Sequence, residues 1–332
     1  MKKGLPRRRA LLTLRAACAA PALVPSHARA QTTLPDKSLR ILVGVTAGGG
    51  AELMARVIAQ QLERRLGRRV SVENKPNDTG TAAGEFLRKG LAEGTVVAFL
   101  PSTTPASTLT STVFPFDSKS DVVPLTMAGA FQVVIAASRT IDVSTFAEYV
   151  AWSKSGPLER ARLGATTTDA YLRIYSRMVG REIGVPLQDV PYRDAAALVA
   201  ALKSGGIPVG LGSATPLLQH VRSGAVRFLM TSGRKRVSVL RTVPTAAELG
   251  HPSLELEDWY GFFASSLSPA PVLAEWNRQL RGVLANNQVK AELAQLGLDV
   301  ETSTQEEAAA RLASHMQAWK TQMESFRMKS AD

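Results

Sequence analysis

Three loops rich in glycine and threonine, at 46–50, 77–81 and 165–168, carry residue types that bind anions. Each follows an apolar run and precedes a segment with helical spacing, so we expect each loop to open a helix. A helix N-terminus offers unpaired backbone N–H groups and a partial positive charge, and glycine lets a ligand approach the backbone closely. The candidate ligand-binding residues in these loops are Thr46, Ala47, Gly48, Gly49, Gly50, Asp78, Thr79, Gly80, Thr81, Thr166, Thr167 and Thr168.

Any one of these loops is more readily structural than functional, because glycine and threonine are also ordinary turn and capping residues. It is their coincidence that favours a shared site. Two such helix starts in one domain facing one in another would hold a carboxylate between them, with each charge-assisted hydrogen bond contributing about 1.5–3 kcal/mol. Tyr192 and Ser213, which each follow a later predicted strand, complete the candidate set.

The motifs of common catalytic and cofactor sites are missing from the sequence. The glycine run at 48–50 fits neither G-x-G-x-x-G nor a P-loop, which requires a following lysine. Segment 210–214 approaches the G-x-S-x-G of serine hydrolases but lacks the final glycine. After residue 30 the chain has no cysteine and three widely spaced histidines, without metal-ligand spacing. We therefore expect no catalytic residue, no metal site and no cofactor.

The first thirty residues have the layout of a secretion signal. A basic start with five Lys or Arg residues precedes an apolar stretch at 10–24, and Ala-Arg-Ala at 28–30 forms a small-x-small cleavage site. The apolar stretch is too short for a membrane-spanning helix. Arg8 and Arg9 fit a twin-arginine signal, and an ordinary Sec signal with extra arginines fits equally well. We expect export to the periplasm and cleavage after Ala30.

The signal carries much of the formal net charge of +12. Residues 1–30 hold seven of the 40 basic residues and no acidic one, which leaves 33 basic and 28 acidic residues and a net charge of +5. The basic clusters at 64–69 and 234–236 lie at predicted helix ends and loops, without the interleaved aromatic residues of a single-strand binding groove. These clusters indicate a solvated surface and no nucleic-acid partner.

Predicted strands and helices alternate along the chain. Apolar runs at 39–45, 70–72 and 95–100 indicate buried strands, and helical spacing separates them. The pattern starts afresh with strands expected at 131–137, 162–165, 188–190, 209–211 and 226–230, again separated by helices. Such alternation predicts an α/β fold with mostly parallel sheets flanked by helices.

The segment from residue 252 onward cannot form an α/β domain alone, because it offers one strand, at 260–264, and three helices. Packing this segment against the first unit would complete that unit, and the chain would then cross between two lobes twice. We therefore predict a signal peptide at 1–30, a discontinuous first lobe at 31–130 plus 252–332, and a second lobe at 131–251. The crossover strands would form a hinge over a cleft.

A set of landmarks, each weak alone, occurs in an order that resembles the Bug family of substrate-binding receptors of tripartite tricarboxylate transporters. The resemblance covers about 34–319 and rests on the segments 34–37, 48–50, 55–56, 72–76, 115–117, 190–193, 243–250 and 259–261. It implies a two-lobed type II periplasmic binding protein that closes on a carboxylate held by backbone amides, small hydroxyls and bridging waters. It also implies that a membrane permease receives the solute. A monomer is our default expectation.

The second loop departs from the pattern of this family. Segment 76–81 places Thr81 where the family usually has Asn, and it adds Asp78 beside the expected anion site. A carboxylate there repels an anionic ligand unless it meets a ligand ammonium. We hypothesise that Asp78 favours a zwitterionic or less anionic ligand.

Two alternatives to a transport receptor remain at this point. An enzyme on the same scaffold would need a catalytic group with a shifted pKa in the cleft. A sensor would bind the same solute and pass its occupancy to a membrane signalling partner.

Overall fold

The computed structural model describes residue 1 and residues 34–76, 80–89, 94–109, 116–117, 120–166, 170–256 and 258–327. The predicted signal peptide with its cleavage site at Ala30 lies outside the described residues, and so do Asp78, Thr79, Thr167 and Thr168. Elements, contacts and absences given below refer to the described residues.

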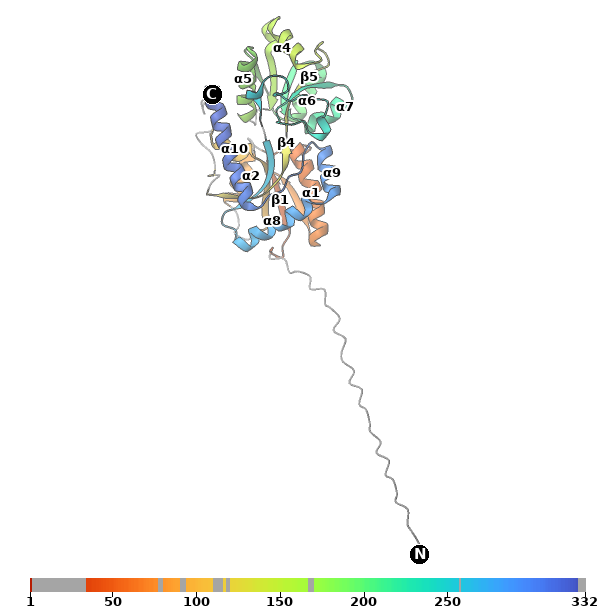
Figure 1. The fold of residues 1–332 in the computed structure, drawn as a ribbon, viewed down its shortest axis with the longest axis vertical. Helices are drawn as coiled ribbons and strands as arrows, with labels where there is room; N and C mark the ends of the chain where they lie inside the picture. The colour runs from red at the N-terminus through yellow and green to blue at the C-terminus, as the bar shows by residue number, and fades with distance from the viewer. Residues whose placement is uncertain are drawn as a thin grey trace. The chain divides into compact units, whose positions relative to one another are not determined.

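In the described part of the chain, the first sheet has five strands in the order β2-β1-β3-β10-β4. These strands are β2 (Val70–Asn74), β1 (Leu39–Val43), β3 (Val96–Pro101), β10 (Asp258–Ser265) and β4 (Val122–Phe131). Strand β10 runs antiparallel to both of its neighbours, whereas β2, β1 and β3 are parallel. The orange and blue helices in Figure 1 belong to this sheet, so early and late segments of the chain form one unit.

Helices bury both faces of the first sheet. The helices α1 (Gly50–Leu66), α8 (Ala270–Leu284) and α9 (Asn287–Gln295) pack on one face, and α2 (Thr81–Arg88) and α10 (Gln305–Ser325) pack on the other. On β1, Ile41 and Val43 contact the first group and Leu42 contacts the second. Side chains alternate along a strand, so a strand buried on both faces is a continuous apolar run.

The second sheet, taken over the same described residues, has five strands in the order β7-β6-β8-β5-β9. These are β7 (Gln188–Tyr192), β6 (Arg162–Thr166), β8 (Val209–Ser213), β5 (Val133–Ser138) and β9 (Val226–Thr231). The helices α4 (Phe146–Lys154) and α5 (Ala170–Ile183) cover one face, and α6 (Ala195–Ser204) and α7 (Thr215–Arg222) cover the other (Figure 1). Strand β5 is the antiparallel member.

The chain passes between the two sheets twice. Strand β4 leads into β5 through Gln132 alone, and β9 of the second sheet is followed by β10 of the first. In each sheet the strand that directly follows a crossing is the antiparallel one, and the other four strands share one direction. The predicted α/β fold with crossover strands is confirmed. The residue bounds of the two lobes remain a prediction.

Strand β4 was not expected from the sequence, which predicted a single strand at 131–137. The structure instead has β4 up to Phe131 and a separate β5 from Val133. Pro124 interrupts the apolar pattern of β4, and a proline normally argues against a central strand. It is tolerated because β4 lies at the edge of its sheet, where it also pairs irregularly with β10.

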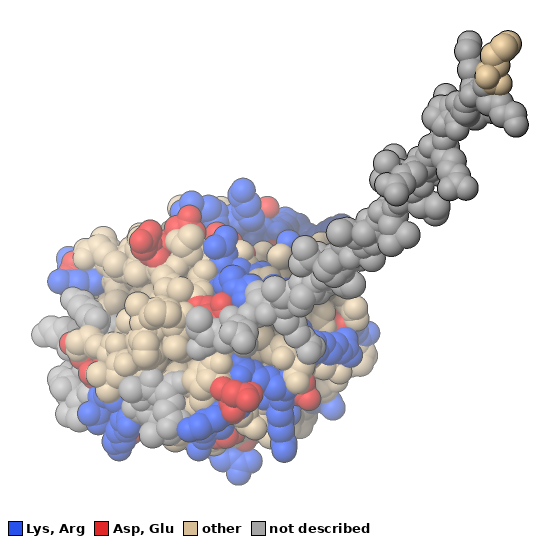
Figure 2. All heavy atoms as spheres, turned by 90° about the horizontal axis from the view of Figure 1, so that it is seen from below, with Lys and Arg blue, Asp and Glu red and all other residues tan. Residues whose placement is uncertain are grey.

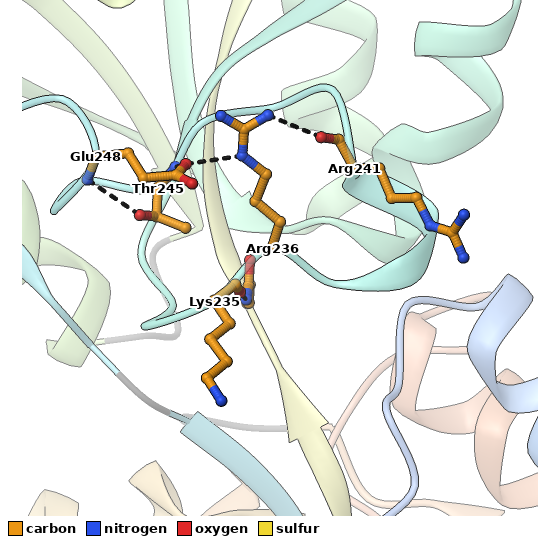
Figure 3. Close-up of polar contacts among 6 residues, drawn as sticks. Lys235, Arg236, Arg241, Thr245 and Glu248 are labelled. Carbon is orange, nitrogen blue, oxygen red and sulfur yellow. Dashed lines mark hydrogen bonds and ion pairs between the residues drawn. The ribbon is translucent and has the colours of Figure 1, made fainter.

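A network of hydrogen bonds closes the loop after β9 (Figure 3). Arg236 donates from Nε to Glu248 at 2.7 Å and from Nη1 to the carbonyl of Arg241 at 2.8 Å. Thr245 and Glu248 bond reciprocally, each backbone N–H donating to the side chain of the other, at 2.9 and 3.2 Å. This arrangement explains the threonine and the glutamate of segment 243–250 and fixes the chain before it returns to the first sheet.

Neutralising Glu248 should lower the Tm at neutral pH and should matter less in acid. The backbone N–H of Thr245 and the guanidinium of Arg236 hold the pKa of Glu248 below its usual value. A lowered folded-state pKa contributes stability above the unfolded pKa, about 4.3, and that stability is lost as pH falls through the folded pKa. Thermal unfolding of Glu248→Gln and wild type should therefore show a Tm difference that shrinks toward low pH.

The control for this comparison is Glu159→Gln, at an exposed position in the 3-10 turn Leu158–Ala161. A Tm difference between Glu248→Gln and wild type that stays constant down to about pH 3 would show that the carboxylate charge is not what stabilises the loop.

The surface mixes charges of both signs. On the face shown in Figure 2, Lys and Arg side chains are interspersed with Asp and Glu, as is typical of a solvated surface. No helix in the described part of the chain has the length and hydropathy to cross a bilayer.

Candidate functional site

A cavity of about 360 Å³ lies at the carboxyl ends of strands from both sheets. Its lining includes Val45 after β1, Pro101 at the end of β3, Thr166 at the end of β6 and Ser213 at the end of β8. Open α/β sheets bind ligands at this end of their strands, and the volume suits a small molecule.

In the described part of the chain, five helices of eight residues or more begin at this cavity. The first sheet contributes the starts of α1 and α2, with Gly50 and Gly80 in the lining, and the second contributes the starts of α5, α6 and α7, with Tyr171, Ala195 and Pro216. Each helix start carries a partial positive charge and N–H groups without intrahelical partners. The two sheets therefore surround one cavity with the positive ends of their helices.

Six of the predicted ligand-binding residues line the cavity: Thr46, Gly49, Gly50, Gly80, Thr166 and Ser213. Four others are described but lie outside the lining, namely Ala47, Gly48, Thr81 and Tyr192. The contact of any of these residues with a ligand remains a prediction.

Local structure explains why two of these four residues lie outside the lining. The N–H of Gly48 donates to the carboxylate of Glu52 in the first turn of α1, at 3.2 Å, so the helix itself uses that donor. The ring of Tyr192 packs on Gly164, where an added Cβ would lie 2.9 Å from Tyr192 Cε2. Because side chains alternate along a strand, the following residue, Arg193, reaches the cavity instead.

The first two loops touch each other at a pair of glycines. Gly80 has φ +83°, in the left-handed region that favours glycine. A Cβ added to Gly44 would collide with the backbone of Gly80, 2.9 Å from its nitrogen. Both residues line the cavity, so only glycine allows the two loops to meet there.

Three charged residues are present in the described lining, Arg193, Asp194 and Asp258. Asp194 caps α6 by accepting from Ala197 N at 2.8 Å and pairs with Arg193 Nε at 3.0 Å. The bond from Ala197, followed by the interaction with Arg193, holds the pKa of Asp194 below its usual value. Asp258 is buried, and it accepts from Ser102 Oγ and, at 2.9 Å, from Trp259 N.

Aromatic rings form one wall of the cavity. The ring of Tyr260 stacks between Phe99 and Phe131, with centroid distances of 4.9 and 4.4 Å, and all three residues are in the lining. Leu172, Leu198 and Leu217 add further apolar surface. The site can therefore enclose a carbon skeleton as well as an anionic group.

The family model of the tripartite tricarboxylate transporter family receptor, TctC, matches residues 54–327. The chain belongs to this family. It is similar to protein BugT of Bordetella pertussis, with 25% identity over 290 residues that cover 86% of this chain and 88% of BugT. The members are solute-binding receptors and not enzymes.

Two solved structures show the same fold. The periplasmic binding protein BugD gives a TM-score of 0.81 at 21% identity, and an R. palustris protein with adipate gives 0.83 at 19% identity. Each comparison covers 89% of this chain and 99% of the other. The predicted type II periplasmic binding protein fold of the receptor is confirmed.

Contacts between the two sheets' helices border the cavity of the receptor. Gly50 at the start of α1 approaches Thr215 at the start of α7, since an added Cβ on Gly50 would lie 2.8 Å from Thr215 Cβ. Thr215 Oγ1 also donates to the carbonyl of Leu296, just after α9, at 2.6 Å. About two turns further along α7, Arg222 donates to Gln295 at 3.3 Å. These contacts tie α7 of the second sheet to helices of the first.

Sequence reasoning missed several lining residues of the receptor. Arg193 and Tyr260 both lie inside segments that carried the family resemblance, so these segments held a usable signal. The sequence carried no such signal for Asp258, because the residues next to it in the chain do not distinguish it from an ordinary surface carboxylate. Over the described residues, His, Cys, Asp and Glu form no group of three or more that could hold a metal ion.

Proposed function

We propose that the receptor binds a small carboxylate-bearing solute in this cavity and delivers it to the subunits of a membrane permease. The observation that supports this most strongly is the convergence of five helix starts, from both sheets, on one cavity. Their N–H groups and partial charges favour an anion, which matches the anion-binding role expected of the glycine- and threonine-rich loops.

A carboxylate ligand is also supported by the relatives. The R. palustris protein of the same fold was solved with adipate, a dicarboxylate. The family itself is named for tricarboxylate transport, which supports a permease as the partner that receives the solute.

Export completes the proposal. The basic start, the apolar stretch and the Ala-Arg-Ala site at 28–30 support secretion by the Tat or Sec route and cleavage after Ala30. The receptor would then work in the periplasm, as a monomer, on solutes that reach that compartment.

The test begins with the full chain expressed in a Gram-negative host and purified from the periplasmic fraction. We expect the purified protein to begin at Gln31 and to carry a small molecule that mass spectrometry identifies as a carboxylate. After this molecule is removed, a panel of mono-, di- and tricarboxylates should include members that raise the Tm. At 100 times the Kd the gain is about 2.7 kcal/mol. A panel without any effect, together with a protein free of small molecules, would contradict the proposed function.

A further inference from the structure

We propose that Asp258 selects the solute, and that the solute is a zwitterion: a carboxylate and an ammonium group on an apolar body of about the size of an aromatic ring. This inference rests on the proposed function and narrows the class of carboxylates that the site accepts. It is carried by the charges, the burial and the aromatic wall of the cavity.

The described lining holds two carboxylates, of Asp194 and Asp258, and one guanidinium, of Arg193, so its side chains offer no surplus cation to a multiply charged anion. Arg193 and Asp194 form an ion pair at 3.0 Å, and the Arg193 side chain is 88% exposed, so this pair lies toward the solvent. The carboxylate of Asp194 is also engaged at the start of α6. These two opposite charges offset each other, and Asp258 adds a second negative charge to the lining.

Burial favours an oppositely charged partner for Asp258, because a low-dielectric site disfavours an uncompensated carboxylate charge. The residue is 2% exposed, and the hydrogen bonds from Ser102 Oγ and Trp259 N hold its carboxylate in place. Electrostatic interactions strengthen as the local dielectric falls. A ligand carboxylate beside Asp258 would be repelled, whereas an ammonium group would be attracted.

The aromatic wall places the apolar part of the solute next to that ammonium group. Asp258 and Tyr260 are two positions apart on β10, so they lie on the same face of the strand, and both line the cavity. Phe99 and Phe131 extend the wall on either side of Tyr260. The helix starts around the rest of the cavity would hold the solute carboxylate.

A matched series of three compounds tests this inference by titration calorimetry. Phenylpropanoate, phenyllactate and L-phenylalanine share a phenyl body and a carboxylate, and they carry hydrogen, hydroxyl and ammonium respectively at the carbon next to the carboxylate. We expect L-phenylalanine to bind the wild type at least about tenfold more tightly than phenylpropanoate. Phenyllactate should fall between them. Adipate should bind more weakly than L-phenylalanine.

The variant Asp258→Asn should remove most of this preference. We expect the affinity ratio of L-phenylalanine to phenylpropanoate to fall by about tenfold, with phenylpropanoate binding as well as before or better. Glu159→Gln is the control, because it neutralises an exposed carboxylate in the 3-10 turn Leu158–Ala161, outside the cavity lining. Its ratio should be unchanged. Ser102→Ala removes a hydrogen bond to Asp258 but keeps the charge, so the preference should persist.

The outcomes separate this inference from the proposed function. Equal binding of phenylpropanoate and L-phenylalanine to the wild type would overturn the role of Asp258, and so would an unchanged ratio in a folded Asp258→Asn. The wild-type series needs no substitution, so it decides the matter even where the variant does not fold. Tight binding of adipate alone would overturn the zwitterion and leave the carboxylate receptor intact. If the whole carboxylate panel fails to bind, the proposed function itself falls.

Discussion

Replacing Tyr260 with alanine should destabilise the receptor by about 3–5 kcal/mol and weaken solute binding at the same time. The side chain is 7% exposed, and its ring lies between Phe99 and Phe131. Truncation removes the buried ring together with both stacking contacts and leaves a void beside the ligand cavity. Chemical unfolding of the ligand-free protein measures the first effect, and calorimetry with the tightest-binding panel carboxylate measures the second.

Tyr260→Phe is the control for this prediction, because it keeps the ring and loses only the hydroxyl. Its cost should stay near 1 kcal/mol. If the alanine variant were as stable as the phenylalanine variant, the stacked wall would contribute little to the fold. The void would then have been filled by movement of the neighbouring strands.

Replacing Gly50 with alanine should lower the affinity for the solute at least about tenfold, and the steric clash should lower the Tm rather than raise it. Alanine favours a helix over glycine, so α1 itself is not weakened. The new Cβ would lie 3.0 Å from Thr215 Cγ2 and 2.8 Å from Thr215 Cβ, and no side-chain rotation can move this Cβ away. The starts of α1 and α7 would therefore separate, and both line the cavity.

Two further variants check this explanation. Gly206→Ala places a Cβ with its nearest neighbour at 3.5 Å, so it should bind solute like the wild type. Adding Thr215→Gly to Gly50→Ala removes all three atoms that the new Cβ meets and should restore part of the affinity. An affinity that does not change in Gly50→Ala would show that the two helix starts need not approach each other for binding.

The elements of the fold could be predicted wherever their signal is local. Strand β1 and helix α1 follow from an apolar run, a glycine turn and helical spacing, which depend on residues only a few positions apart. The same holds for the helix starts at Gly50 and Thr81. Strand β4 escaped prediction because its edge position, which makes Pro124 acceptable, depends on the whole sheet.

The candidate site also has a part that could be predicted from the sequence and a part that could not. Loops that open helices at the ends of strands are visible in the sequence, and six of the predicted residues do line the cavity, including Gly49, Thr166 and Ser213. Whether a residue within such a loop points into the cavity depends on strand alternation and on local hydrogen bonds. Arg193 therefore lines the cavity where Tyr192 was expected, and the N–H of Gly48 is taken by Glu52.

By itself the sequence determined the alternation of strands and helices, the loops that open the helices, and the family to which the receptor belongs. All of these rest on short segments read in order. The tertiary structure alone decided that five helix starts surround one cavity, and that a buried carboxylate lies among them. The hydrogen bond from Ser102 to Asp258 joins residues 156 positions apart. Such neighbours are set by the pairing of β10 with β3, and local periodicity carries no information about that pairing.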